Sequence, residues 1–246
     1  MLAPEVRHMA FRRRDGQPLA FVPGQFLQIH FEHQGRQLRR SYSIASRPDD
    51  PANPEHEIEI AVSYVQGGAA TALLSGLREG EGLAASGPYG RFVLHPEDQN
   101  RRYLLIATGT GVTPYRAMLP ELRRGIPARG FEVALVYGAR NPGDLLYGAE
   151  FERFAEEVPG FRFYPCFSRV PRAEPLPDDR AGRVQVALPE LGPDAAQDIA
   201  YLCGNPEMVD SCFALLKEAG LPIPHIRREK YISPADPKAR VVAVVD

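Results

Sequence analysis

The chain has 246 residues, a length that fits one large or two modest domains and allows a substantial buried core. Hydrophobic residues make up 44% of it and charged residues 24%, the proportions of an ordinary soluble globular protein. The formal net charge is only −2, so the charge of the whole chain favours neither a nucleic acid nor an anionic membrane as a partner.

The cysteines and histidines argue against a disulfide framework or a metal centre. Cys166, Cys203 and Cys212 are odd in number and have no CxxC spacing. His30 and His33 lie in a strand-like stretch that makes a poor metal site, so no bound metal is expected. The N-terminus lacks the basic and apolar regions of a signal peptide, and no apolar run is long enough to cross a bilayer. We therefore expect a cytoplasmic protein.

Up to about residue 98, short apolar runs alternate with turn residues, which predicts an antiparallel sheet that closes into a barrel or sandwich. Strands are expected at residues 6–11, 25–31, 39–44, 58–65 and 82–86. One helix is expected at residues 70–77, behind Gly67 and Gly68. The start of such a helix leaves free backbone N–H groups that can hold an anion, with the Thr71 hydroxyl beside them. The alternative is a plain capped helix between two strands.

The strand expected at residues 39–44 carries a cation, an aromatic ring and a hydroxyl in fixed order. Alternate residues of a strand share one face and lie roughly 6.5–7 Å apart, so Arg40 and Tyr42 can address one elongated ligand. Arg40 suits a pyrophosphate, Tyr42 suits a ring face, and Ser43 can reach a ring nitrogen, which together indicate a flavin seat. The alternative is that Arg40 and Tyr42 are ordinary cross-strand partners.

From about Arg101 onward, strands alternate with helices, a pattern that predicts a parallel sheet covered on both faces. Strands are expected at residues 103–108, 131–137, 161–167 and 199–203. Helices are expected at residues 114–124, 147–157 and 206–219. The polar stretch 95–100 is the expected linker between the two patterns.

A glycine-rich turn follows the first of these parallel strands and opens a helix, which predicts a pyrophosphate cradle. The residues expected to form it are Gly109, Thr110, Gly111 and Pro114. The turn departs from the GxGxxG fingerprint at its last position, and the second strand lacks the acidic residue that would bind a free ribose 2′-hydroxyl. The alternative is a merely structural turn.

The next two strand ends carry Arg140 and the pair Ser168-Arg169, which suit a ribose 2′-phosphate. Each charge-assisted contact contributes ~1.5–3 kcal/mol, so NADPH is expected to bind one to a few orders of magnitude more tightly than NADH. Cys203 ends the last strand at the ligand-binding edge and is expected to face a nicotinamide. The alternative for Cys203 is a buried structural cysteine, the role expected of Cys166 and Cys212.

These blocks, taken in order, resemble the ferredoxin/flavodoxin–NADP⁺ reductase family of bacterial-type FAD enzymes. The resemblance covers nearly the whole chain and rests on Pro23-Gly24-Gln25-Phe26, Arg40-Ser41-Tyr42-Ser43, Gly109-Thr110-Gly111-Val112-Thr113-Pro114, Asp144-Leu145-Leu146-Tyr147 and Cys203-Gly204-Asn205-Pro206-Glu207-Met208. It implies an FAD-binding β-barrel at residues 1–98 and an NADP(H)-binding α/β domain at residues 99–230, with the flavin between them. Residues 231–246 would form a C-terminal extension near the flavin.

The resemblance also implies roles for individual residues. The FAD-binding residues would be Arg40, Ser41, Tyr42, Ser43, Gly67, Gly68 and Thr71. The NADP(H)-binding residues would be Gly109, Thr110, Gly111, Pro114, Arg140, Ser168 and Arg169. The catalytic residues would be Ser43 at the flavin N5, Cys203 at the nicotinamide, Glu229 close by, and Tyr231 over the other flavin face.

The implied activity is hydride transfer between NADPH and FAD, followed by single-electron transfer to or from a ferredoxin or flavodoxin. The protein would be a monomer with a basic docking rim formed by Arg12, Arg13, Arg14, Arg36, Arg39, Arg227 and Arg228, unless these are ordinary solvated arginines. Three other functions share the motifs: the reductase component of a separate-chain oxygenase, an NAD(P)H–flavin reductase, and a flavin-binding regulatory subunit without turnover.

Both chain ends depart from the family pattern. The first strand begins in its middle near Met1, which leaves open an upstream start or a short barrel edge. Residues 232–246 run on past Tyr231, and we expect this tail to cover the adenine end of the flavin or to pair with a sheet edge, with a disordered tail as the alternative.

Overall fold

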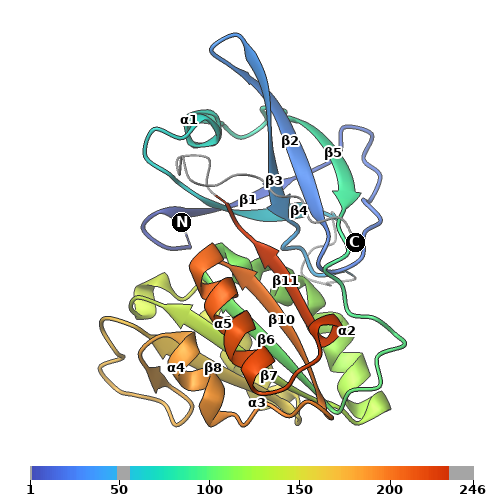
Figure 1. The fold of residues 1–246 in the computed structure, drawn as a ribbon. Coiled ribbons are helices and arrows are strands. Elements are labelled where there is room, and N and C mark those ends of the chain that lie inside the picture. Colours follow the sequence, from blue (N-terminus) through green and yellow to red (C-terminus); the bar gives the residue numbers. More distant parts are fainter. Residues whose placement is uncertain (1, 49–55, 233–246) are drawn as a thin grey trace.

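A computed structural model describes residues 2–48 and 56–232, which form two stacked domains (Figure 1). The first domain is built from antiparallel strands and lies above an open parallel sheet in this view. Both parts agree with the fold class expected from the sequence. Of the expected tail at residues 232–246, residues 233–246 lie outside the described residues.

The first domain contains two small antiparallel sheets. Its elements are β1 (Val6–Phe11), β2 (Phe26–His33), β3 (Arg36–Ser43), β4 (Ile58–Ser63), α1 (Ala69–Gly76) and β5 (Ala84–Tyr89). One sheet has the order β3-β2-β5, the other pairs β1 with β4, and a bridge between Ile44 and Ile60 joins them. Alternate residues of β2 point inward, so Ile29 and Phe31 pack with Ile60 and with Leu74 of α1 in the core of the domain.

The β2–β3 hairpin fixes the position of the proposed flavin seat. Its turn needs positive φ at both central positions, and Gln34 has a φ of 52° and Gly35 a φ of 73°. The register pairs Phe26 with Ser43, so Ser43 lies at the end of β3 opposite the turn. Since the hairpin tip points away from the second domain, the Ser43 end faces it (Figure 1).

The second domain is a parallel sheet with the strand order β11-β10-β6-β7-β8-β9. Its strands are β6 (Arg102–Thr108), β7 (Glu132–Ala139), β8 (Phe161–Phe167), β9 (Arg180–Ala181), β10 (Asp198–Gly204) and β11 (Ile226–Lys230). Its helices are α2 (Thr113–Arg129), α3 (Gly148–Glu157), α4 (Val184–Glu190) and α5 (Pro206–Glu218), with 3₁₀ turns at η1 (Gly109–Val112), η2 (Pro142–Asp144) and η3 (Ile223–His225).

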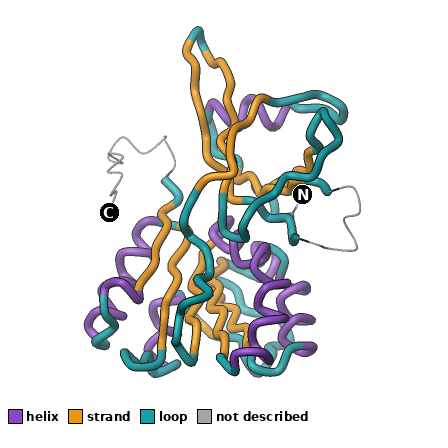
Figure 2. Tube along the Cα trace, turned by 90° about the vertical axis from the view of Figure 1, so that its right-hand side faces the viewer, coloured by secondary structure: helices purple, strands orange, loops and turns teal. Residues whose placement is uncertain are grey.

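Helices cover both faces of this sheet, as Figure 2 shows from the side. The central strand β6 explains why, because it is apolar on both faces. Tyr103 and Leu105 pack into the core with α2 and α3, whereas Leu104 and Ile106 pack into the core with α4 and α5. None of the helices formed by residues 2–48 and 56–232 combines the length and hydropathy needed for a transmembrane span.

The last strand, β11, is anchored to the interdomain linker. Arg227 donates to both carboxylate oxygens of Asp98 at 2.6 Å, and the Tyr103 hydroxyl donates to Asp98 at 3.0 Å. Arg227 also contacts the hydroxyl of Tyr201 on β10. These contacts fix β11 at the edge of the sheet and so position Glu229 and the residues that follow it.

Candidate active site

The residues expected to seat a flavin, Arg40, Tyr42 and Ser43, lie on β3. Within the described residues, β3 pairs only with β2. Tyr42 and Arg40 are half-buried, and their cross-strand partners on β2 are the apolar residues Leu27 and Ile29. Burial raises the pKa of Tyr42 to about 12, against the lowering effect of the nearby Arg40 charge. Arg40 donates only to the carbonyl oxygen of Arg39, at 2.7 Å, among the hydrogen bonds of the described chain, so its remaining donors can meet a phosphate.

The expected anion site at the start of α1 is built from backbone. Gly67 has a φ of +72°, and a Cβ on it would meet no atom of residues 2–48 and 56–232 within 4 Å. Gly68 caps the helix without a side chain. The Thr71 hydroxyl accepts a hydrogen bond from the Val65 N–H at 2.8 Å. Thr71 therefore stabilises the loop between Val65 and α1, and its hydroxyl can still donate its own proton to a bound anion.

The four residues expected to be catalytic meet at one point between the domains. Ser43 comes from the first domain, and its hydroxyl contacts the hydroxyl of Tyr231. Cys203 on β10 is the register partner of Glu229 on β11. Tyr231 follows β11 directly, and its N–H donates to the carbonyl oxygen of Gly204 at 2.8 Å.

Burial sets the charge states in this cluster. Burial raises the pKa of Glu229 to about 7, although a hydrogen bond with Ser43 opposes the shift. Burial and the neighbouring Glu229 raise the pKa of the Cys203 thiol well above its usual range, so the thiol is neutral and is not an activated nucleophile. Burial likewise raises the pKa of Tyr231. Glu229 is therefore the group in this cluster whose charge changes near neutral pH.

The glycine-rich turn forms η1 and the first residues of α2. Gly111 is buried against β10, and a Cβ on it would lie 2.3 Å from the carbonyl oxygen of Cys203. Thr113 donates to the carbonyl oxygen of Thr110 at 2.6 Å, which closes the turn. Pro114 is buried in the first turn of the helix, so Pro114, like Gly111, shapes the loop from within the fold. Gly109, by contrast, is exposed at the surface of the loop.

A cavity of about 510 Å³ opens at the carboxyl ends of the parallel strands, where an open α/β sheet binds ligands. Its lining includes the expected residues Gly109, Arg140, Ser168 and Arg169. The Arg169 N–H donates to the carbonyl oxygen of Arg140 at 2.9 Å, so the two arginines lie on adjacent strand ends. Arg140 also pairs with Asp144, Nε to Oδ2 at 2.7 Å.

Sequence reasoning missed part of this lining. Arg183 and Gln185 enter the cavity from the start of α4, and Asn205 enters from the end of β10. Gln185 Oε1 is buried and has no hydrogen-bond partner among the described residues. A buried acceptor without a partner is costly unless a ligand donates to it. The cavity volume, its three arginines and this acceptor fit a phosphorylated nucleotide.

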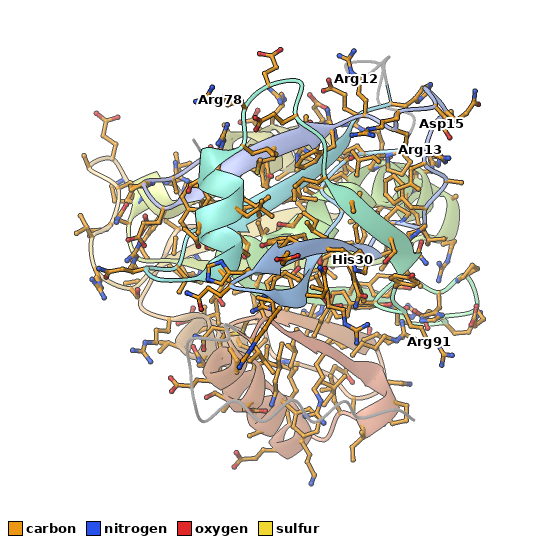
Figure 3. All side chains as sticks on the ribbon, turned by 90° about the horizontal axis from the view of Figure 1, so that it is seen from above. Arg12, Arg13, Asp15, His30, Arg78 and Arg91 are labelled. Atoms are coloured by element: carbon orange, nitrogen blue, oxygen red, sulfur yellow. The ribbon has the colours of Figure 1, made fainter. Side chains whose placement is uncertain are left out.

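Of the arginines expected to form a basic rim, Arg12, Arg13 and Arg227 pair with carboxylates. Arg12 pairs with Glu57 at 2.9 Å and Arg13 with Asp15 at 2.5 Å. Figure 3, a view from above, shows Arg12 and Arg13 beside Asp15. Arg227 is half-buried and binds Asp98, so it belongs to the interior of the fold.

Comparison with known proteins agrees with this geometry. Residues 1–94 match the model of the oxidoreductase FAD-binding domain, and residues 105–213 match that of the oxidoreductase NAD-binding domain. The chain is 36% identical to ferredoxin–NADP reductase B of Sorangium cellulosum over 94% of this chain and 93% of that protein. It is also 36% identical to the reductase subunit of an aromatic O-demethylase of Amycolatopsis over 87% of this chain but only 62% of that protein.

Two solved structures have the same fold. A cytochrome P450 reductase of Amycolatopsis aligns with a TM-score of 0.78 and 34% identity, over 93% of this chain and 66% of that chain. A ferredoxin NADP⁺ reductase of Neisseria gonorrhoeae, with FAD and NADP bound, aligns with a TM-score of 0.74 and 23% identity, over 93% of this chain and 94% of that chain.

Proposed function

This chain belongs to the ferredoxin–NADP⁺ reductase family of FAD- and NAD(P)-binding oxidoreductases, and we propose that NADPH is its hydride donor. We further propose that its electron partner is a small ferredoxin or flavodoxin. The observation that carries the proposal is the meeting of Ser43 from the first domain with Cys203 and Glu229 from the second. We assign residues 1–98 to FAD and residues 99–230 to NADP(H).

In the first domain, Arg40 and the backbone of Gly67 and Gly68 would hold the FAD pyrophosphate, with the Thr71 hydroxyl as a further donor. Tyr42 would cover one face of the flavin ring. Ser41 points to the opposite side of β3 from Arg40 and Tyr42 and would contribute its backbone.

In the second domain, Gly109, Thr110 and Gly111 would receive the nucleotide pyrophosphate, and Pro114 would fix the start of α2 behind them. The 2′-phosphate would lie between the strand ends that carry Arg140, Ser168 and Arg169. This pocket would favour NADPH over NADH because two guanidinium groups recognise phosphate oxygens.

FAD held by these residues would supply hydride acceptance and the release of single electrons, chemistry that protein side chains lack. Ser43 would orient the reacting ring by a hydrogen bond, and Glu229, with a pKa of about 7, would hold or release a proton at the Ser43 hydroxyl. Cys203 would guide the nicotinamide as a neutral, closely packed contact. Tyr231 would exclude water from the cleft until the nicotinamide displaces it.

Anaerobic titration of the purified yellow protein with NADPH and then NADH tests this proposal. Bleaching of the flavin absorbance by NADPH at much lower concentration than by NADH is the expected result. A protein without flavin absorbance would refute the assignment of the first domain, and equal bleaching by both nucleotides would refute the 2′-phosphate site. A flavin that neither nucleotide bleaches would indicate a regulatory subunit.

A second candidate is the reductase component of an oxygenase system. It is favoured by the 36% identity to the O-demethylase reductase subunit and by 31% identity to the reductase component of a propane 2-monooxygenase of Rhodococcus jostii. The chain spans 62% and 56% of these two proteins, so their complete activities do not transfer to it. Assays with ferredoxin, flavodoxin, free flavin and an oxygenase component as acceptors separate these functions by which acceptor gives the highest kcat/KM.

A further inference from the structure

Arg116 ties the nucleotide-binding loop to the first domain. It is only 8% exposed and lies in the first turn of α2, directly behind η1. Its Nη1 donates to the carbonyl oxygen of Ala45 at 2.8 Å and pairs with Glu59 Oε2 at 2.5 Å. Ala45 follows Ser43 by two residues, and Glu59 lies on β4, so both partners belong to the domain that carries the flavin seat.

The second domain holds the same guanidinium from its other side. Nε donates to Glu150 Oε2 at 2.8 Å, and the guanidinium carbon lies 4.6 Å from the ring centroid of Tyr147. The Tyr147 hydroxyl in turn lies 3.2 Å from Nδ1 of His8 in the first domain. Tyr147 has a φ of +57°, a conformation that a bulky residue rarely adopts, so local backbone strain accompanies the placement of this ring between the domains.

Charges alternate along this contact and cross the domain boundary repeatedly. Arg47 lies 3.1 Å from Glu150, measured from Nη1 to Oε1, and His8 lies 3.3 Å from Glu59, measured from Nε2 to Oε1. Burial alone would raise the pKa of Glu59, but the hydrogen bond from His8 and the charge of Arg116 lower it to about 2. Glu59 is therefore ionised at neutral pH. Arg116 faces the carboxylates of Glu59 and Glu150, which are largely shielded from water.

We propose that Arg116 is a positioning residue that sets the distance between the nucleotide-binding loop and the flavin seat. This inference rests on the proposed function. The planar guanidinium offers donors in fixed directions, so it constrains Ala45, Glu59 and Glu150 at once, which a flexible ammonium does not do. A shift of α2 against Ala45 moves the loop of Gly109 relative to Ser43, and a misplacement of about 1 Å is enough to slow a reaction ~100-fold.

A merely stabilising ion pair makes a different prediction. Its loss would lower the melting temperature and leave the limiting rate of hydride transfer in the folded protein unchanged. Arg116→Lys keeps the charge but loses the planar guanidinium and its fixed donor directions. A positioning role predicts that this variant retains FAD and binds NADPH with nearly unchanged affinity. The limiting rate of flavin reduction then falls ~10–100-fold.

The matched control is Arg123→Met on the same helix. Arg123 pairs with Glu157 and stacks on Phe154 at 4.9 Å, contacts that lie wholly within the second domain. Anaerobic stopped-flow reduction of each FAD-loaded variant, over a series of NADPH concentrations, separates the limiting rate from the apparent Kd. Arg123→Met should match the parent protein in both values. Glu59→Gln, which keeps the shape of the side chain, should reproduce the rate loss of Arg116→Lys.

Hydrogen exchange without nucleotide gives an independent readout. The Ala45 N–H donates to the carbonyl oxygen of Glu59 at 2.7 Å, and the Ile44 N–H donates to that of Gln25 at 3.0 Å. Both amides should exchange faster in Arg116→Lys than in the parent protein and in Arg123→Met.

The outcomes separate the two claims. An unchanged limiting rate in folded Arg116→Lys, or a weaker NADPH affinity as the sole effect, would overturn the positioning role. Unchanged exchange at Ala45 would overturn it even if NADPH failed to reduce the parent protein. Failure of NADPH to reduce the flavin of the parent protein would by itself refute the proposed function.

Discussion

Gly111 lies against Cys203 so closely that a Cβ on Gly111 would stand 2.3 Å from the carbonyl oxygen of Cys203. Gly204, the next residue of β10, makes a similar contact with the end of β6, because a Cβ on Gly204 would stand 2.6 Å from the carbonyl oxygen of Thr108. The glycine-rich loop and the tip of β10 therefore touch backbone to backbone. This contact places the proposed nucleotide cradle directly beside the cysteine expected to face the nicotinamide.

Gly111→Ala should therefore damage both stability and nucleotide binding. The added methyl group meets backbone atoms that cannot rotate away, so we expect a loss of about 1–3 kcal/mol in the free energy of unfolding and a weaker affinity for NADPH. Denaturant unfolding and NADPH titration measure the two effects. Gly76→Ala is the control, since a Cβ at Gly76 meets no atom of the described residues within 4 Å, and an equal loss in both variants would contradict this expectation.

Ser43 and Arg40 should separate hydride transfer from FAD binding. Ser43→Ala removes the hydroxyl that contacts Tyr231, so we expect FAD to stay bound while its reduction by NADPH slows ~100-fold or more. Arg40→Ala removes a cation from the proposed pyrophosphate site and should release FAD during gel filtration. If both variants kept FAD and the full rate, the flavin would lie elsewhere.

Discrimination between NADPH and NADH should depend on Arg169. Arg169→Ala removes one charge-assisted contact to the proposed 2′-phosphate, so the ratio of kcat/KM for the two nucleotides should fall ~10–100-fold, mainly through KM for NADPH. Arg162→Ala is the control because Arg162 lies on the opposite end of β8, away from the cavity. A rate loss that was equal for NADPH and NADH would show that Arg169 does not recognise the phosphate.

The elements that the sequence predicted correctly are those with strong periodicity. β6 is a run of buried apolar residues, and the turn from Gly109 to Pro114 has a recognisable glycine and proline spacing. β9 has only the two residues Arg180 and Ala181, and β11 has the sequence IRREK with a single apolar residue, so neither carries a strand pattern. Helix α2 runs on to Arg129, past Pro127, until Gly130 with a φ of +70° ends it.

The site residues likewise divide into those that a sequence motif indicated and those that it did not. The structure places together Ser43, Cys203, Glu229 and Tyr231, the residues to which the resemblance assigns catalytic roles, although 188 positions separate Ser43 from Tyr231. Arg116 gave no such signal, because an arginine on an amphipathic helix normally faces solvent. Only the packing of the two domains shows that its partners are Ala45 and Glu59.

The pH dependence of stability should reveal the burial of Glu229. Its pKa is about 7 in the folded protein against an ordinary value of 4.5, so between these pH values the folded protein retains a proton that the unfolded chain has lost. Stability should therefore fall as pH rises through this window, and the penalty, at most about 3 kcal/mol, is complete above pH 7.

Glu229→Gln cannot ionise, so it should lose this slope and be more stable than the parent protein at pH 8 but not at pH 5. Urea unfolding of the FAD-free protein from pH 5 to 8 measures the difference between the two proteins, which cancels the other titrating groups. Glu218→Gln, an exposed change near the end of α5, should follow the parent curve throughout. Parallel curves for Glu229→Gln and the parent protein would show that Glu229 has an ordinary pKa, and the proposed proton at the Ser43 hydroxyl would then have no source in this cluster.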